Sequence, residues 1–345
     1  MARADVTVRG AGVFGLSIAY ACARRGARVR VIDPGGIATG ASGGVLGALA
    51  PHAPGNWNAL KAFQFESLVM AESFWAGVDA ESGLSSGYAR AGRIQPVADA
   101  AALALARSRS RAAEENWKDE AVWQVVPAKD AGPWAPLSPT GWLIRDTLSA
   151  RICPRGACAS LVGAIRALDG EIGGEKEDGA VVWATGVAGL DALSDHLGRA
   201  MGDGVGGRAL LLDRAAPAGT PQIFADALHI VPHADGTTAV GSTSGHSSSG
   251  LAADAALDDI LARSVAACPA LAGASTLERW GGVRPRSRSR APLLGSWPGR
   301  PGHFVANGGF KIGFGIAPKV AKTMADLVLD GRDDIPGEFR VDAGS

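Results

Sequence analysis

The pattern that most constrains this chain is a glycine-rich turn, GAGVFG, close to its start. Its glycines have the spacing G-x-G-x-x-G and are Gly10, Gly12 and Gly15. With 48 glycines in 345 residues, this spacing alone carries little information. Its context is informative, because β-type runs at residues 6–8 and 29–32 flank the turn and a helix-type run at residues 16–25. The sequence therefore predicts a βαβ unit, which requires a parallel sheet.

The same turn predicts a dinucleotide site. In such a unit Gly10 makes the tight turn, Gly12 lets the backbone approach a pyrophosphate, and Gly15 lets helix and strand pack closely. The start of the helix would then direct free N–H groups and positive partial charge at the phosphates. Asp33, 23 residues after Gly10, would accept hydrogen bonds from the ribose and repel a 2′-phosphate. The alternative is a glycine-rich turn in an ordinary α/β sheet.

Composition favours a small-molecule partner. Lys+Arg and Asp+Glu number 34 each, so no net charge attracts nucleic acid or an anionic membrane. The composition is globular, with 47% apolar and 20% charged residues, and no run is long enough to span a bilayer. Residues 10–23 also resemble a short secretory signal, but Asp5 and the glycine spacing argue against that alternative.

Cysteine and histidine usage indicates a cytoplasmic protein without a metal site. Four cysteines show no C-x-x-C pair, and six histidines are scattered. We therefore expect free thiols in a reducing compartment and no zinc cluster.

The rest of the chain contains both helix-type and strand-type sequence patterns. Helix-type periodicity occurs at residues 71–78, 100–116, 154–168, 257–265 and 318–329, and a flexible GHSSSG loop is expected at residues 245–250. Short apolar runs predict strands at residues 93–97, 142–144, 180–183, 210–212, 229–231 and 238–240. We expect an α/β fold in which a Rossmann-like domain with a parallel sheet is interleaved with a second domain built on a largely antiparallel sheet.

A second glycine-dense segment, GGIATGASGGVLGALAP at residues 35–51, suits contact with a long ribityl-pyrophosphate and so favours FAD over NAD. Here the chain resembles the D-amino acid oxidase family of FAD oxidoreductases, which includes glycine and sarcosine oxidases. VVWATG at residues 181–186 is similar to the family's strand ending in A-x-G. RWGGVRPRSRSRAPLLG at residues 279–295 and ANGGFKIGFGIAP at residues 306–318 are similar to its C-terminal signature.

The resemblance implies an FAD-binding domain of residues 1–50, 150–204 and 282–345 and a substrate domain of residues 51–149 and 205–281. The segment before residue 181 is shorter than the family's usual β meander. Residues 293–303 lack the cysteine of members with covalent flavin, so we expect non-covalent FAD. The implied cofactor-binding residues are Gly10, Gly12, Val13, Phe14, Gly15, Asp33, Ser42, Gly43, Gly44, Gly47, Ala184, Thr185, Gly186, Gly308, Gly309, Phe310, Lys311 and Gly313.

The resemblance also implies two cationic site residues. Arg284 matches the residue that binds the substrate carboxylate in D-amino acid and glycine oxidases. Its planar guanidinium suits this role because it can bind a carboxylate in two places. Its alternative is a solvated stripe, since arginines alternate at positions 284, 286, 288 and 290. Lys311 resembles the lysine that contacts the substrate carboxylate in the sarcosine-oxidase-like branch, and its alternative is an ordinary surface lysine. A helix starting near Gly315 would direct its N-terminus at the flavin.

Two histidines are further catalytic candidates. His52 follows the second glycine segment, and His229 occupies the place of an active-site tyrosine of D-amino acid oxidases. Either ring could accept an amine proton, although a buried structural histidine is the more common case.

We expect an FAD-dependent oxidase or dehydrogenase that oxidises the C–N bond of an amino acid or small secondary amine by hydride transfer. The imine would hydrolyse, and O₂ or another acceptor would reoxidise the flavin. The alternatives are a 2-hydroxy acid oxidase or dehydrogenase, a non-catalytic flavin-binding protein, and an oxidase of a modified nucleoside, which the balanced charge disfavours.

Overall fold

A six-stranded sheet carries the glycine-rich turn in a computed structural model that describes residues 3–241 and 254–342. Its neighbouring strands run parallel except for the β15–β16 pair at one edge. In spatial order they are β15 (Leu293–Ser296), β16 (His303–Asn307), β9 (Ala180–Trp183), β1 (Val6–Arg9), β2 (Val29–Ile32) and β8 (Glu171–Ile172). This is the predicted parallel sheet. The shortened segment before β9 contributes only β8 to it.

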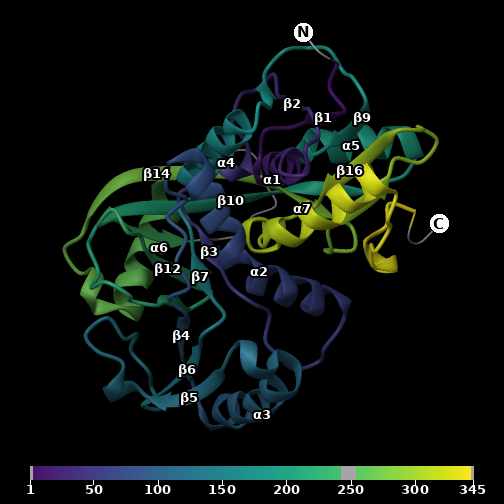
Figure 1. Cartoon of the computed structure of the whole chain (residues 1–345). Helices are drawn as coiled ribbons and strands as arrows, with labels where there is room; N and C mark the ends of the chain where they lie inside the picture. The colour runs from purple at the N-terminus through teal and green to yellow at the C-terminus, as the bar shows by residue number, and fades with distance from the viewer. Residues whose placement is uncertain (1–2, 242–253, 343–345) are drawn as a thin grey trace.

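Helices cover this sheet. They are α1 (Val13–Ala23), α4 (Pro154–Ala167), α5 (Gly186–Leu197) and α7 (Gly313–Asp330), and α2 (Ala59–Ser82) packs on α4 and α7. Helix α1 packs against α4 and α7 as well as β1 and β2 (Figure 1). Because it is enclosed in this way, ten of its eleven residues are buried and it has no polar face.

An eight-stranded sheet forms the second half of the molecule, and its pairs are antiparallel except for β11–β4. In order its strands are β14 (Ser275–Ser287), β10 (Gly202–Asp213), β13 (Thr238–Gly241), β12 (Leu228–Pro232), β11 (Gln222–Ala225), β4 (Arg93–Pro96), β6 (Trp142–Asp146) and β5 (Trp123–Pro127). Helix α6 (Asp254–Ala267) packs on β10, and α3 (Ala100–Trp117) packs on β5. The prediction of a largely antiparallel second sheet is confirmed.

Strands β10 and β14 join the two halves. They pair over their whole length, and α5 of the first half also packs on both of them (Figure 1). A short ribbon of β3 (Ala48–Leu49) and β7 (Ala150–Arg151) makes a second connection. The expected domain limits at residues 204/205 and 282 fall inside β10 and β14, so the exact division into domains stays a prediction.

Four helices begin earlier than the sequence predicts, among them α2 at Ala59 rather than residue 71 and α6 at Asp254 rather than residue 257. Helix α1 starts at Val13 rather than residue 16. Its first turn contains Gly15, where an added Cβ would overlap the Gly10 carbonyl. Helix α7 starts at Gly313 rather than Pro318 and includes that proline. Burial of its first turns against α1 and α2 outweighs the hydrogen bond that proline removes. The predicted 245–250 loop lies outside the described residues.

No helix within residues 3–241 and 254–342 is long and apolar enough to cross a bilayer.

The four cysteines are free thiols, and burial raises the pKa of Cys22 and Cys158 to about 12.

A buried ion pair ties β4 to β6. Arg93 Nε donates to Asp146 Oδ2 at 2.9 Å, with the two side chains 7% and 0% exposed. Asp146 Oδ1 also accepts from the Ser149 N–H at 2.8 Å. Breaking a buried pair leaves an uncompensated charge, so we expect Asp146→Ala to lower the free energy of unfolding by about 3–5 kcal/mol.

Urea denaturation checks this expectation. The matched control is Asp258→Ala, because Asp258 pairs with Arg279 on the surface, where the side chains are 62% and 40% exposed. That change should lower the free energy of unfolding by less than about 1 kcal/mol. Equal losses in the two variants would contradict the structural importance of the buried pair.

Candidate active site

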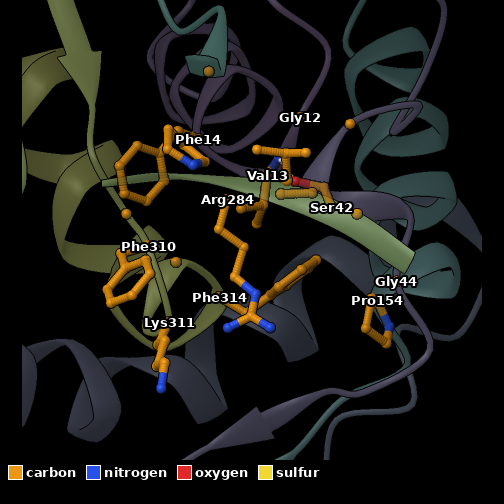
Figure 2. Close-up of a pocket in the computed structure, with 18 of the residues that line it drawn as sticks. Gly12, Val13, Phe14, Ser42, Gly44, Pro154, Arg284, Phe310, Lys311 and Phe314 are labelled. Carbon is orange, nitrogen blue, oxygen red and sulfur yellow. Dashed lines mark hydrogen bonds between the residues drawn. The ribbon is translucent and has the colours of Figure 1, made fainter. Parts of the chain in front are cut away.

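A cavity of about 910 Å³ lies where the two sheets meet, which is within the size range of ligand sites. It is lined by the β1–α1 turn, the second glycine-dense segment, the starts of α4 and α5, strand β14, the β11–β12 hairpin and the β16–α7 connection. Figure 2 shows residues from these separate segments converging on one space. The parts of the site that are distant in sequence therefore form a single continuous pocket.

The first glycine turn has the geometry that close backbone approach requires. Gly10 has φ +105°, a conformation that favours glycine, and an added Cβ would overlap the Ala184 carbonyl of the neighbouring β9–α5 turn. An added Cβ on Gly12 would meet only the Ser42 side chain, with Oγ at 3.1 Å. The N-terminus of α1 is therefore open to the cavity on the Gly12 side.

Two polar side chains hold this turn in place. Asp33 Oδ2 accepts from the Ala11 N–H at 2.8 Å, and Oδ1 accepts from the Gly35 N–H at 2.9 Å. Ser42 Oγ accepts from the Val13 N–H at 2.9 Å and so joins the two glycine segments. Each carboxylate oxygen of Asp33 can accept one more hydrogen bond, and Asp33 lines the cavity.

Most of the expected cofactor residues line this cavity. Those that do are Gly12, Val13, Phe14, Asp33, Ser42, Gly44, Gly47, Ala184, Thr185, Gly186, Gly309, Phe310, Lys311 and Gly313. The expected residues outside its lining are Gly10, Gly15, Gly43 and Gly308. Gly10, Gly15 and Gly43 lie against backbone carbonyls of neighbouring turns. They therefore allow the close packing of the loops that form the cavity wall.

Arg284 enters the cavity from β14 (Figure 2). It is 8% exposed, and burial lowers the pKa of its guanidinium. An added Cβ on Gly207 of the paired strand β10 would overlap this guanidinium, so Gly207 provides its space.

The alternative of a solvated arginine stripe is wrong for β14. Arg286 is on the strand but forms a surface pair with Asp203 at 2.7 Å. The strand ends at Ser287, so Arg288 and Arg290 lie beyond it.

Lys311 lies in the short connection between β16 and α7, and its side chain extends into the same cavity (Figure 2). Burial lowers the pKa of its ammonium, and the positive charge of Arg284 lowers it further. Its Nζ lies 5.7 Å from the centroid of the Phe310 ring. Asp33 is the one carboxylate among the described residues that line the cavity.

His229 lines the cavity from β12 as a neutral ring. Its Nδ1 lies 3.2 Å from Gln222 Oε1. Because Gln222 Nε2 already donates to the carbonyls of Ala150 and Leu49, its Oε1 is the acceptor and His229 Nδ1 carries the hydrogen. Burial, then Arg93 and Lys311, lower the pKa of His229 to about 3, so its Nε2 keeps a free lone pair at neutral pH.

His52 is not among the described residues that line the cavity. Its side chain is exposed to solvent, and Nδ1 lies 2.5 Å from Gln64 Oε1. Gln64 Nε2 donates to the Ala50 carbonyl at 2.9 Å, so this amide fixes the loop that follows the second glycine segment. The structure therefore separates His52 from the other three candidates.

Sequence reasoning missed several aromatic residues of the cavity wall. Trp280 lies on β14, and its indole lies against Gly44 and the space beside Gly282. The alternation of β14 puts Trp280, Gly282 and Arg284 on one face, a signal already present in RWGGVRP. Phe224 pairs with His229 across the β11–β12 hairpin, with ring centroids 4.7 Å apart, and only the hairpin register reveals it.

Comparison with known proteins identifies the family. The DAO family model, described as FAD dependent oxidoreductase, matches residues 5–327. A glycine oxidase of Pseudomonas putida is 26% identical, and the match covers 96% of each chain. A glycine oxidase of Geobacillus kaustophilus is 23% identical, with 94% of this chain and 93% of the relative covered.

Solved structures agree on the fold. Glycine oxidase from Bacillus cereus superposes with a TM-score of 0.83 at 20% identity, covering 96% of each chain. Iminodiacetate oxidase from Chelativorans superposes with a TM-score of 0.79 at 21% identity, covering 96% of this chain and 97% of the other. Together with the family match over nearly the whole chain, this shows that the protein is an enzyme of the DAO family of FAD-dependent oxidoreductases.

Proposed function

We propose that this enzyme oxidises the C–N bond of an amino acid or small secondary amine whose carboxylate binds Arg284. The observation that carries the proposal is a buried guanidinium in the same cavity as the glycine-lined dinucleotide segments. Two relatives named glycine oxidase, each matched over more than nine tenths of its length, support an amino-acid substrate.

The cavity residues fit FAD. Gly12 leaves the α1 N-terminus uncovered for a pyrophosphate, and Asp33 has acceptor capacity left for ribose hydroxyls. Gly309 and Gly313 line the cavity where α7 begins, so the positive end of that helix would face a flavin ring there. The described lining contains no cysteine, which supports non-covalent binding. When bound, FAD supplies the hydride acceptor for C–N oxidation.

The protein's own contribution is positioning. A guanidinium binds a carboxylate in two places and so fixes both the position and the rotation of the substrate. His229 Nε2, with its lone pair, would accept a hydrogen bond from the substrate amine and orient it as a neutral group. Hydride loss from carbon and proton loss from nitrogen give an imine, which water converts to an oxo acid and an amine.

His229 has too low a pKa to act as a base near neutral pH. Its folded-state value of about 3 lies below the ordinary 6.5, so it stays neutral above pH 5 and gains a proton only near pH 3. We therefore expect His229→Gln to lower kcat/KM without changing the shape of its pH profile between pH 5 and 9. A change of kcat/KM with a midpoint near pH 6.5 that is present in the wild type and absent from the variant would contradict this role.

Anaerobic bleaching of the flavin tests the proposed reaction. Glycine, sarcosine, proline and D-amino acids should be compared with lactate and glycolate at equal concentration. Bleaching by amines and not by hydroxy acids is the expected result. Bleaching by hydroxy acids alone would indicate C–OH oxidation, and a flavin that no substrate reduces would indicate a binding protein. Repeating the active reactions in air with peroxide detection distinguishes O₂ from another acceptor.

A further inference from the structure

Among the described residues, two cationic side chains and one carboxylate line the cavity. Arg284 and Lys311 both line it, and Asp33, the one carboxylate of its described lining, is bonded to the backbone of the first glycine turn. His229 adds no charge at neutral pH.

The two cations extend from neighbouring backbone segments. The Phe310 N–H donates to the Pro285 carbonyl at 3.0 Å, so the residues next to Lys311 and Arg284 are directly bonded. Phe310 itself has φ +41°, a strained conformation for a residue with a side chain. Figure 2 shows both side chains extending from these neighbouring backbones into the same space.

Two neighbouring, partly buried cations repel each other and lose hydration, and a ligand with two anionic groups relieves both effects. The pKa of Lys311 is lowered by Arg284 as well as by burial, in agreement with their proximity. A single carboxylate bound by the guanidinium would leave the ammonium without an anion from the described lining.

We propose that Arg284 and Lys311 form a two-cation subsite that selects amines with two carboxylates. Arg284 binds the carboxylate next to the carbon that loses hydride. Lys311, a flexible point charge, binds a second carboxylate on the side chain or on the nitrogen substituent. This inference rests on the proposed function, and the reaction is the same. The second carboxylate contributes to binding and takes no part in bond breaking.

Matched ligand pairs test the subsite in the FAD-loaded enzyme. Iminodiacetate differs from sarcosine, and glutarate from butyrate, by one carboxylate. Substrate pairs are compared by kcat/KM, and the non-oxidisable acids by the change that they cause in the flavin absorption spectrum. A charge-assisted hydrogen bond contributes about 1.5–3 kcal/mol, so we expect a preference of about 10- to 100-fold for the dicarboxylate in each pair.

Lys311→Met should abolish that preference, so that the dicarboxylate and the monocarboxylate of each pair bind with equal affinity, and Lys311→Arg should restore it. The control is Lys319→Met on α7, because Lys319 pairs with Glu66 at 2.5 Å away from the cavity lining.

Equal binding of the two acids to the wild type, or equal losses for both in Lys311→Met, would overturn the inference and leave the proposed function standing. If no amine reduces the flavin, the proposed function fails, and the binding titration with glutarate and butyrate still decides whether the subsite exists.

Discussion

Replacing Arg284 with alanine is expected to reduce kcat/KM for the amino-acid substrate by between about 30-fold and a few thousand-fold while FAD remains bound. Truncating one partner of a buried, hydrogen-bonded charge pair costs about 2–5 kcal/mol, and each 1.4 kcal/mol corresponds to a factor of ten. Arg284 is only 8% exposed, so water cannot replace it efficiently as a carboxylate partner. Anaerobic flavin reduction measured against substrate concentration gives both the rate and the apparent affinity.

Arg286→Ala is the matched control for this substitution. It removes the same side chain two residues along β14, where the arginine forms a surface pair with Asp203. We expect its kcat/KM to stay within about threefold of the wild type, because exposed pairs contribute little. Equal losses in the two variants, or an Arg284→Ala enzyme that retains full kcat/KM, would contradict the role of Arg284 as carboxylate clamp.

Replacing Gly12 with valine is expected to weaken FAD binding by about 100-fold or more in a protein that still folds. The backbone of Gly12 is extended, with φ −85° and ψ −179°, which valine adopts readily. Because an added Cβ meets only Ser42, the new side chain extends over the α1 N-terminus instead of disrupting the turn. It would displace the pyrophosphate from helix N–H groups, and the loss of two charge-assisted hydrogen bonds of about 1.5–3 kcal/mol each exceeds a factor of 100.

Gly337→Val is the control for Gly12→Val. Gly337 is exposed, no atom lies within 4 Å of an added Cβ, and it is outside the described lining of the cavity. Both variants should keep the circular dichroism spectrum of the wild type, and only Gly12→Val should lose flavin on gel filtration. Retention of stoichiometric FAD by Gly12→Val would mean that the pyrophosphate does not bind at the start of α1.

The parts of the fold that the sequence predicts are those with local signals. Residues 6–33 combine a glycine turn, an apolar helix and two β-type runs within one short segment, and β1, α1 and β2 formed as expected. The lengths of β10 and β14 could not be predicted, because GDGVGG at residues 202–207 has few of the apolar side chains that indicate a strand. Pairing with β14 over twelve positions supplies the order that local propensity lacks.

The same distinction applies to the site. Arg284 and Lys311 could be proposed from their motifs, but their neighbouring backbones depend on the Phe310–Pro285 hydrogen bond, which no local pattern encodes. The tautomer of His229 depends on Gln222, whose amide is fixed by carbonyls of Leu49 and Ala150 from distant segments. Sequence proximity also suggested His52, whereas its hydrogen bond to Gln64 keeps it with the loop outside the described cavity lining.

The most direct test is a titration of the flavin-free protein with FAD, in which binding is measured by the quenching of flavin fluorescence. One FAD per chain should bind with a sharp end point, and riboflavin, which lacks the diphosphate and the adenosine, should bind far more weakly. Failure to bind FAD saturably, or equal affinity for riboflavin, would contradict the assignment of the glycine-lined cavity to the dinucleotide.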